Sequence, residues 1–149
     1  MIHKATQIIQ SALEAKGLKY QVHEIGGMSL IDCGFGGENC SVRVNFLSAD
    51  EDCDVKIISL PIAKYPKARL SEGYELMNTL NAKYRFVKWV IDRDGDIHVE
   101  FDMLSDTPPV ILGDLALEAF LRMVKIADDA YPTIMRKIWS EQPSATVLD

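Results

Sequence analysis

Residues 84–104 read YRFVKWVIDRDGDIHVEFDML, two alternating apolar runs on either side of a turn sequence, and this stretch decides the fold. Two β-hairpin registers fit it. A two-residue turn would set Trp89 opposite Glu100, whereas a three-residue turn with Gly95 in the left-handed conformation sets Trp89 opposite Val99. A slip of one residue moves every side chain to the other face of a sheet, so the choice matters. We favour the three-residue turn, which pairs apolar residues with each other.

The same register sets Lys88 opposite Glu100, an attractive pair. It also puts Phe86 and Val90 on the other face of the hairpin, together with charged and polar side chains. A mixed apolar and charged surface of this kind suits a protein partner if no other part of the chain covers it. The polar neighbours expected there are Lys88, His98, Glu100 and Asp102.

Outward from the hairpin, the chain alternates between helical and strand patterns. Apolar residues recur at helical spacing from Ile2 to Leu13, while Val42, Val44 and Phe46 alternate with polar residues as in a half-buried strand. The patterns predict helices over residues 2–16, 66–81 and 112–139, and strands over residues 20–24, 28–32, 41–47 and 54–60.

These elements predict an α+β fold. An antiparallel β-sheet, made of a meander plus the hairpin, packs with an N-terminal helix, a middle helix and a long C-terminal helix. Pro132 lies inside the last helical pattern, so we expect a kink or a break just before it. Gly73 lies inside the middle helix, where either its cost is tolerated or another segment packs closely. We expect one domain over residues 1–140 and a disordered tail over residues 141–149.

Charge and composition narrow the classes of partner. The net charge of -6 lacks the basic footprint of a DNA- or RNA-binding protein, and no apolar stretch approaches the length of a membrane helix. The N-terminus is too polar for a secretory signal, and three cysteines are an odd number. We therefore expect reduced thiols in the cytoplasm, with no nucleic acid or membrane as a partner.

The glycine-rich stretch CGFGGENC, residues 33–40, is the first candidate for chemistry. Phosphate loops lead into a helix N-terminus, but a strand follows this one and no Gly-Lys-Ser/Thr element is present, so a plain loop is expected. Six residues separate Cys33 from Cys40, unlike the close ligand pairs of zinc sites. We expect buried thiols, although a metal or redox pair at the strand ends stays open.

The remaining polar clusters have structural interpretations as well. Asp92, Asp94 and Asp96 surround Gly95 in a way that fits a hairpin turn better than a calcium loop. The chain has no nucleophile elbow and no zinc-protease motif. We therefore expect no catalytic, cofactor-binding or metal-binding residues, no cofactor, and a protein that is not an enzyme.

Four strings in the second half of the chain resemble the YbjN-like family of bacterial proteins. They are DVKIISLPI (residues 54–62), YELMNTLN (residues 74–81), the hairpin quoted above and ADDAYPTIM (residues 127–135). The resemblance is strongest over residues 54–135, and it implies a fold like that of type III secretion chaperones. It also implies a regulatory or chaperone-like binding protein, in which the matching strings mark structural positions and carry no catalytic residue.

Two hypotheses for function follow. The first is a protein-binding module, a homodimer that holds a protein or peptide partner. Its expected partner surface consists of Phe86, Val90 and His98 on the hairpin and Ile138 and Trp139 at the end of the last helix. The second is a small-molecule sensor or an unrecognised enzyme that uses the Cys33–Cys40 loop.

Overall fold

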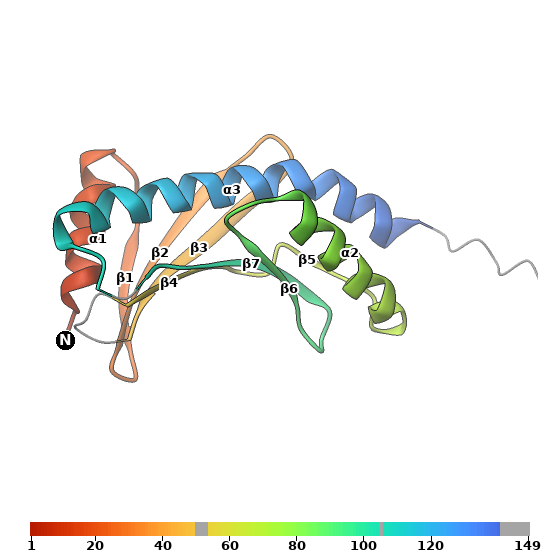
Figure 1. Ribbon diagram of the computed structural model, residues 1–149, viewed down its shortest axis with the longest axis horizontal. Helices are drawn as coiled ribbons and strands as arrows, with labels where there is room; N and C mark the ends of the chain where they lie inside the picture. The colour runs from red at the N-terminus through yellow and green to blue at the C-terminus, as the bar shows by residue number, and fades with distance from the viewer. Residues whose placement is uncertain (50–53, 105, 141–149) are drawn as a thin grey trace, which may run out of the picture.

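The computed structural model describes residues 1–49, 54–104 and 106–140 (Figure 1). The predicted order of helix, meander, helix, hairpin and long helix is confirmed, and one short strand, β5, was not predicted. The elements are α1 (Lys4–Ala15), β1 (Gln21–Ile25), β2 (Met28–Gly36), β3 (Ser41–Ser48), β4 (Val55–Ser59), β5 (Ala63–Lys64), α2 (Leu70–Lys83), β6 (Lys88–Ile91), β7 (Asp96–Asp102) and α3 (Pro109–Trp139), with a 3₁₀ turn over Lys67–Arg69 before α2. The expected tail over residues 141–149 lies outside the described residues.

The strands form one antiparallel sheet. Strands β1 to β4 follow one another as a meander. Strand β4 and then β5 pair with successive parts of β7, and β6 pairs with the other side of β7. The sheet therefore has β1 and β6 at its two edges, and the hairpin quoted above forms the β6 end.

The hairpin has the register of the three-residue turn. Trp89 lies opposite Val99, and Gly95 has a φ of 87°, as the prediction requires. The Asp92 carboxylate accepts the backbone N–H of Asp96 at 3.0 Å within the turn. This acidic cluster therefore organises the turn, which agrees with the structural interpretation of its carboxylates.

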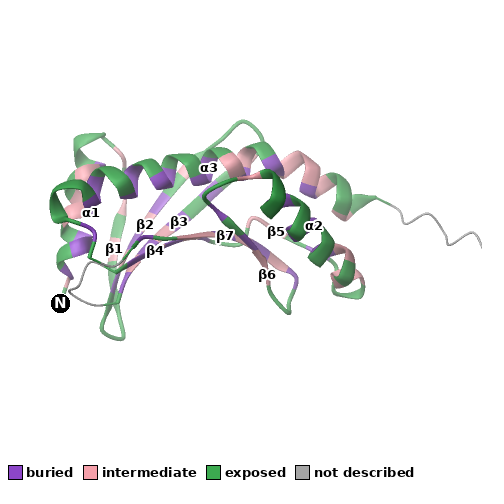
Figure 2. Ribbon diagram, in the orientation of Figure 1, coloured by how far each residue is buried: buried purple, intermediate pink, exposed green. Residues whose placement is uncertain are grey.

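Helices α1 and α3 pack on each other and over the same face of the sheet (Figure 1). Figure 2 shows buried positions recurring along α3, as expected for a helix with one face against the core. The opposite face of the sheet carries partly buried or exposed side chains. The largest fully buried side chains are Tyr65, Phe46, Phe120, Ile9, Leu13, Ile31, Ile57, Leu80, Ile97, Leu112, Met123 and Ile134.

Helix α2 packs beside the edge strand β6, and Gly73 explains how closely. A Cβ atom on Gly73 would lie 2.7 Å from Ile91 Cδ1 and 3.3 Å from Tyr65 Cγ. The glycine is therefore needed for close packing, the second of the two explanations left open. At the other end of α2, Asn81 accepts the backbone N–H of Trp89 at 2.8 Å and donates to its carbonyl at 3.1 Å.

The last helix begins at Pro109 and continues through Pro132 to Trp139. The predicted alternative of a break before Pro132 is wrong. Proline has no N–H for the carbonyl of Asp128, four residues earlier. That carbonyl instead accepts the side-chain N–H of Asn39 at 3.1 Å, so the helix continues past Pro132 without leaving this acceptor unsatisfied.

Candidate functional site

The structure does not bring the five predicted partner-surface residues together. Val90 lies opposite His98 on the open face of the sheet, as predicted. Phe86 does not join them, which corrects the sequence prediction. Its φ of 75° breaks the alternation just before β6, and its ring stacks 4.7 Å from the guanidinium of Arg122 on α3. Phe86 therefore lies on the helix side of the sheet.

The end of α3 is a separate region. Arg69 donates to the carbonyls of Lys137 and Ile138, each at 3.0 Å, and so caps the C-terminal end of the helix with a positive charge. Ile138 packs against the core, whereas Trp139 is exposed. Of these two predicted surface residues, only Trp139 is freely available to a partner.

A charge cluster surrounds Glu100 on the open face of the sheet. The Glu100 carboxylate lies 2.8 Å from His98 Nε2, 3.1 Å from Lys88 Nζ and 3.2 Å from Lys56 Nζ. Burial by itself would raise the pKa of Glu100, but hydrogen bonds from these three side chains outweigh burial and lower that pKa to about 2. The cluster is internally paired, so it ties β4, β6 and β7 together.

An apolar groove of about 320 Å³ lies between the end of β7 and the first half of α3. Three of its lining side chains project substantially into solvent: Leu104 is 84% exposed, Phe86 is 54% exposed and Leu115 is 43% exposed. The rest of the apolar lining comes from Phe101, Met103 and Ala119. Such a hollow, open and lined almost wholly by carbon, is suited to receiving apolar side chains.

Charged side chains stand around the mouth of this groove. Arg122 pairs with Glu118 at 2.7 Å, one turn away on α3. Arg85 and Arg122 both lie over the Phe86 ring, at 5.2 and 4.7 Å from its centroid. Asp102 completes the rim at the strand end. The groove thus has an apolar floor and a charged border, the usual anatomy of a protein-binding patch.

Sequence reasoning missed the α3 side of this groove. Apolar spacing along the last predicted helix does not separate covered from uncovered positions: Leu121 is 43% exposed, whereas Leu115 and Ala119 line the groove. One signal was present. The first half of α3 has apolar residues around most of its circumference. These are more apolar residues than a single buried face of a helix can accommodate. The surplus residues are Val110, Ile111, Leu115 and Leu121.

The glycine-rich loop is shorter than predicted, because β2 continues through Cys33 to Gly36. The backbone N–H groups of the remaining turn converge on an anion of the protein itself. The Asp128 carboxylate accepts hydrogen bonds from the backbone N–H groups of Asn39 at 2.7 Å, Cys40 at 3.0 Å and Glu38 at 3.2 Å. These bonds, led by that from Asn39, lower the pKa of Asp128. The loop therefore does bind a carboxylate, and that carboxylate comes from α3.

Cys33 and Cys40 do not form a pair. Cys33 lies opposite Val44 on the buried face, whereas Cys40 precedes Ser41 at the start of β3. Four strand positions separate them, which is roughly 14 Å at about 3.4 Å per residue. Burial raises the pKa of both thiols, away from the thiolate form that nucleophiles and metal ligands need. This geometry gives the Cys33–Cys40 sensor or enzyme hypothesis no support.

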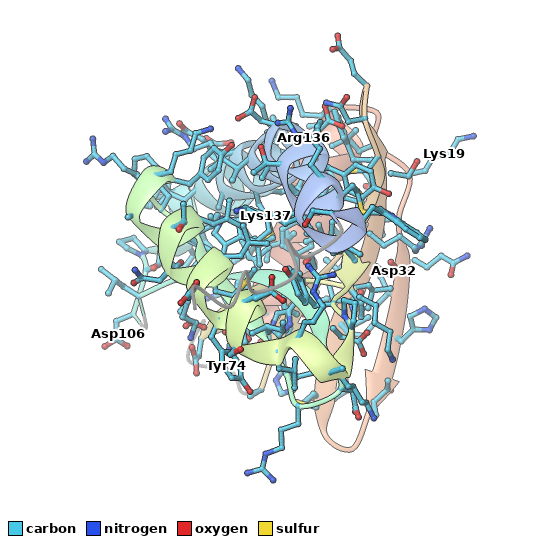
Figure 3. All side chains as sticks on the ribbon, turned by 90° about the vertical axis from the view of Figure 1, so that its right-hand side faces the viewer. Lys19, Asp32, Tyr74, Asp106, Arg136 and Lys137 are labelled. Atoms are coloured by element: carbon cyan, nitrogen blue, oxygen red, sulfur yellow. The ribbon has the colours of Figure 1, made fainter. Side chains whose placement is uncertain are left out.

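A second, polar hollow lies between the chain before β1 and strands β2 and β3. Its main charges, Arg43 and Asp32, already pair with each other at 2.6 Å. Figure 3 shows Asp32 and Lys19 on the side of the molecule away from Asp106, whose neighbour Thr107 lines the apolar groove. The two hollows are therefore independent.

Residues 1–49, 54–104 and 106–140 contain no group of three or more histidine, cysteine, aspartate or glutamate side chains placed to hold a metal ion. Over the same residues, no helix has the length and apolar character needed to cross a membrane.

Comparison with known proteins now gives the family. No curated protein matches the chain. The model of the YbjN family, described as "putative bacterial sensory transduction regulator", matches residues 6–132. The match begins well before residue 54, where the resemblance seen in the sequence becomes strong, and it includes the groove, the hairpin and the Asp128 loop. Because it spans most of the chain, the protein belongs to the YbjN family.

Proposed function

We propose that this protein is a non-catalytic regulatory module that binds an apolar segment of a protein or peptide partner in the groove between β7 and α3. The observation that carries the proposal is the groove itself. Its lining is apolar apart from the rim, and it is open to solvent along Phe86, Leu104 and Leu115. Burial of exposed apolar surface is the main favourable contribution to most protein association.

The shape of the groove favours a chain segment over a metabolite. Small-molecule sites enclose most of their ligand and hold a few convergent polar groups in volumes of roughly 300–1,000 Å³. This groove is at the small end of that range, and its lining includes Leu104, which is 84% exposed. A segment of a larger partner could insert one or two side chains and lie across the surrounding surface.

The family and the charge support the same class of function. The YbjN description is that of a regulator, and regulators act through partners. The resemblance to the fold of secretion chaperones, which hold unfolded client segments, points the same way by analogy. The net charge of -6 favours a partner segment with basic residues beside its apolar ones. A cytoplasmic location belongs to this proposal and is supported by free thiols at Cys33 and Cys40.

Site-specific photocrosslinking in the bacterium tests the proposal. A benzoylphenylalanine is placed at Leu115, in the groove, or at Leu121, which is equally exposed at 43% on the same helix but does not line the groove. We expect a crosslinked partner from position 115 and not from position 121. Mass spectrometry of the product should identify an apolar stretch at the crosslinked position.

A second pair of variants makes the test independent of crosslinker chemistry. With the crosslinker at Ala119, Leu115→Arg should abolish the product because a guanidinium would occupy the groove, whereas Leu121→Arg should leave it. Equal products from both positions, or no product from any groove position, would remove the basis of the proposal.

A further inference from the structure

The ladder between β6 and β7 stops before β7 does. Asp92 N donates to Asp96 O, which makes these two residues a hydrogen-bonded pair at the turn. Such pairs alternate along an antiparallel ladder, so the next ones are Val90 with His98 and Lys88 with Glu100. The pair after these would involve Asp102.

The described part of the chain supplies no partner for Asp102 on that side. Residue 86 would be its partner, but β6 begins at Lys88, and the positive φ of Phe86 turns the backbone away from the edge. The neighbouring Met103 bonds in the other direction, to Val55 O at 3.0 Å. Within the described residues, the ladder register therefore leaves the N–H and C=O of Asp102 facing an edge position with no strand residue beside it.

A positive φ at phenylalanine is itself informative. A positive φ is strained for a bulky side chain, whereas glycine adopts it freely. Residues with a strained backbone cluster at binding and switching sites. Here the strain takes the chain off the sheet at the mouth of the apolar groove, with the Phe86 ring as part of the lining. The open edge and the groove are therefore parts of one surface.

We propose that this surface binds its partner as an added β-strand: an extended segment pairs with Asp102 and inserts alternate apolar side chains into the groove beside Phe101 and Met103. This inference rests on the function proposed above and specifies its partner. Successive strand residues point to opposite faces. The residues on either side of the one opposite Asp102 would thus point into the groove, while that residue would lie on the open face.

The charge pattern of β7 predicts which residue of the partner segment lies opposite Asp102. On the open face, Lys88 lies across from Glu100 and Lys56 lies across from Asp102, with Nζ to carboxylate distances of 3.1 and 3.7 Å. Each acid of β7 thus has a cross-strand lysine, and the empty position beside Asp102 continues the pattern. The partner segment is accordingly apolar–basic–apolar, with Lys or Arg in the centre.

Synthetic peptides test this directly on the full chain. The probe is a fluorescent, end-blocked peptide, Thr-Val-Thr-Leu-Lys-Leu-Thr-Val-Thr, compared with the same peptide N-methylated at the lysine amide and with one carrying Glu in place of Lys. We expect N-methylation to weaken binding at least about tenfold, because it removes a backbone donor to Asp102. Binding of the parent peptide should also slow hydrogen exchange of the Asp102 amide.

A charge reversal gives a sharper result. Asp102→Lys should reverse the preference, so that the Glu peptide binds better than the Lys peptide. Asp114→Lys makes the same change of net charge at an exposed site on α3 outside the groove, and should leave the preference unchanged. Thermal melting of both variants confirms that they remain folded.

The outcomes separate this inference from the function it rests on. If the parent peptide binds and loses affinity on Leu115→Arg, yet N-methylation and Asp102→Lys change nothing, strand addition is overturned while groove binding stands. If no peptide binds and the groove positions crosslink nothing in the cell, both are overturned. If sedimentation shows a dimer that Leu115→Arg dissociates, the occupant is a second copy of the chain and the peptide inference is overturned.

Discussion

The side-chain N–H of Asn39 bonds at 3.1 Å to the main-chain carbonyl of Asp128, the acceptor that Pro132 deprives of its helical donor. In return, the Asp128 carboxylate accepts the backbone N–H of Asn39 at 2.7 Å. The connection between β2 and β3 and a proline-containing helix thus satisfy each other's unpaired groups. The exchange joins the β2–β3 turn to α3, and it explains why a proline lies within a continuous helix.

This relationship predicts a coupling between residues far apart in sequence. Asn39→Ala leaves the Asp128 carbonyl without a donor and should lower the free energy of unfolding by about 1 kcal/mol. In a Pro132→Ala background, where a helical N–H is restored, the same change should cost about 0.5 kcal/mol less. Urea denaturation of the four proteins of this double-mutant cycle measures the difference. Strict additivity would show that the side chain of Asn39 does not replace the missing helical bond.

The charge cluster at Glu100 predicts a pH dependence of stability. The pKa of Glu100 is lowered from 4.5 to about 2 in the folded protein. A lowered folded-state pKa stabilises the fold fully above about pH 4.5, and this contribution is lost as pH falls through about 2. The free energies of unfolding of the wild type and Glu100→Gln should thus differ at pH 7 and converge as the pH falls from about 4.5 through 2. Glu75→Gln, an exposed change on α2, serves as the control, and a gap that persists to pH 2 would contradict the cluster.

The edge strand β6 depends on a side chain of α2. Asn81 bonds both the N–H and the C=O of Trp89, which an edge strand would otherwise present to other chains. Asn81→Ala should lower the free energy of unfolding by about 1–2 kcal/mol and increase aggregation at high concentration. Asn78→Ala, at an exposed site one turn earlier, should change neither. Urea denaturation and light scattering are the measurements, and equal behaviour of the two variants would argue against this role for Asn81.

The backbone strain at Phe86 predicts an inverted order of substitutions. With a φ of 75°, Phe86→Gly should be more stable than Phe86→Val by about 1–2 kcal/mol, because valine cannot adopt this conformation without strain. Tyr74, an exposed aromatic inside α2, should show the opposite order, since glycine is the poorer helix former. The same order at both positions, measured by urea denaturation, would mean that Phe86 does not hold its positive φ in solution.

Local patterns were sufficient for much of the fold. Alternation and the left-handed preference of Gly95 predicted the hairpin register, since one slip would have buried charges. The meander and the helices followed from periodicity in the same way. Strand β5 was missed because it has only two residues, Ala63 and Lys64, and two residues are too few to show a periodic pattern. The full length of β2 was missed because three glycines resemble a loop until Asp128 is seen to hold the turn.

Local sequence patterns did not predict most of the candidate site. Phe86 was selected as a surface residue, but strict alternation put it on the wrong face, because alternation fails where one residue takes a positive φ. Leu115 and Ala119 were not selected, because a helix pattern shows how many apolar residues surround a helix but not which of them the sheet leaves uncovered.

The sequence by itself determined the class of the fold, its hairpin register and its family, because these depend on local periodicity and on strings of neighbouring residues. Only the tertiary structure decided where the groove lies, which carboxylate holds the glycine-rich turn and where the β7 edge is left open. The physical reason is that each of these depends on groups that meet through packing. Asn39 and Asp128 are 89 residues apart in sequence, and no local pattern predicts that they bond.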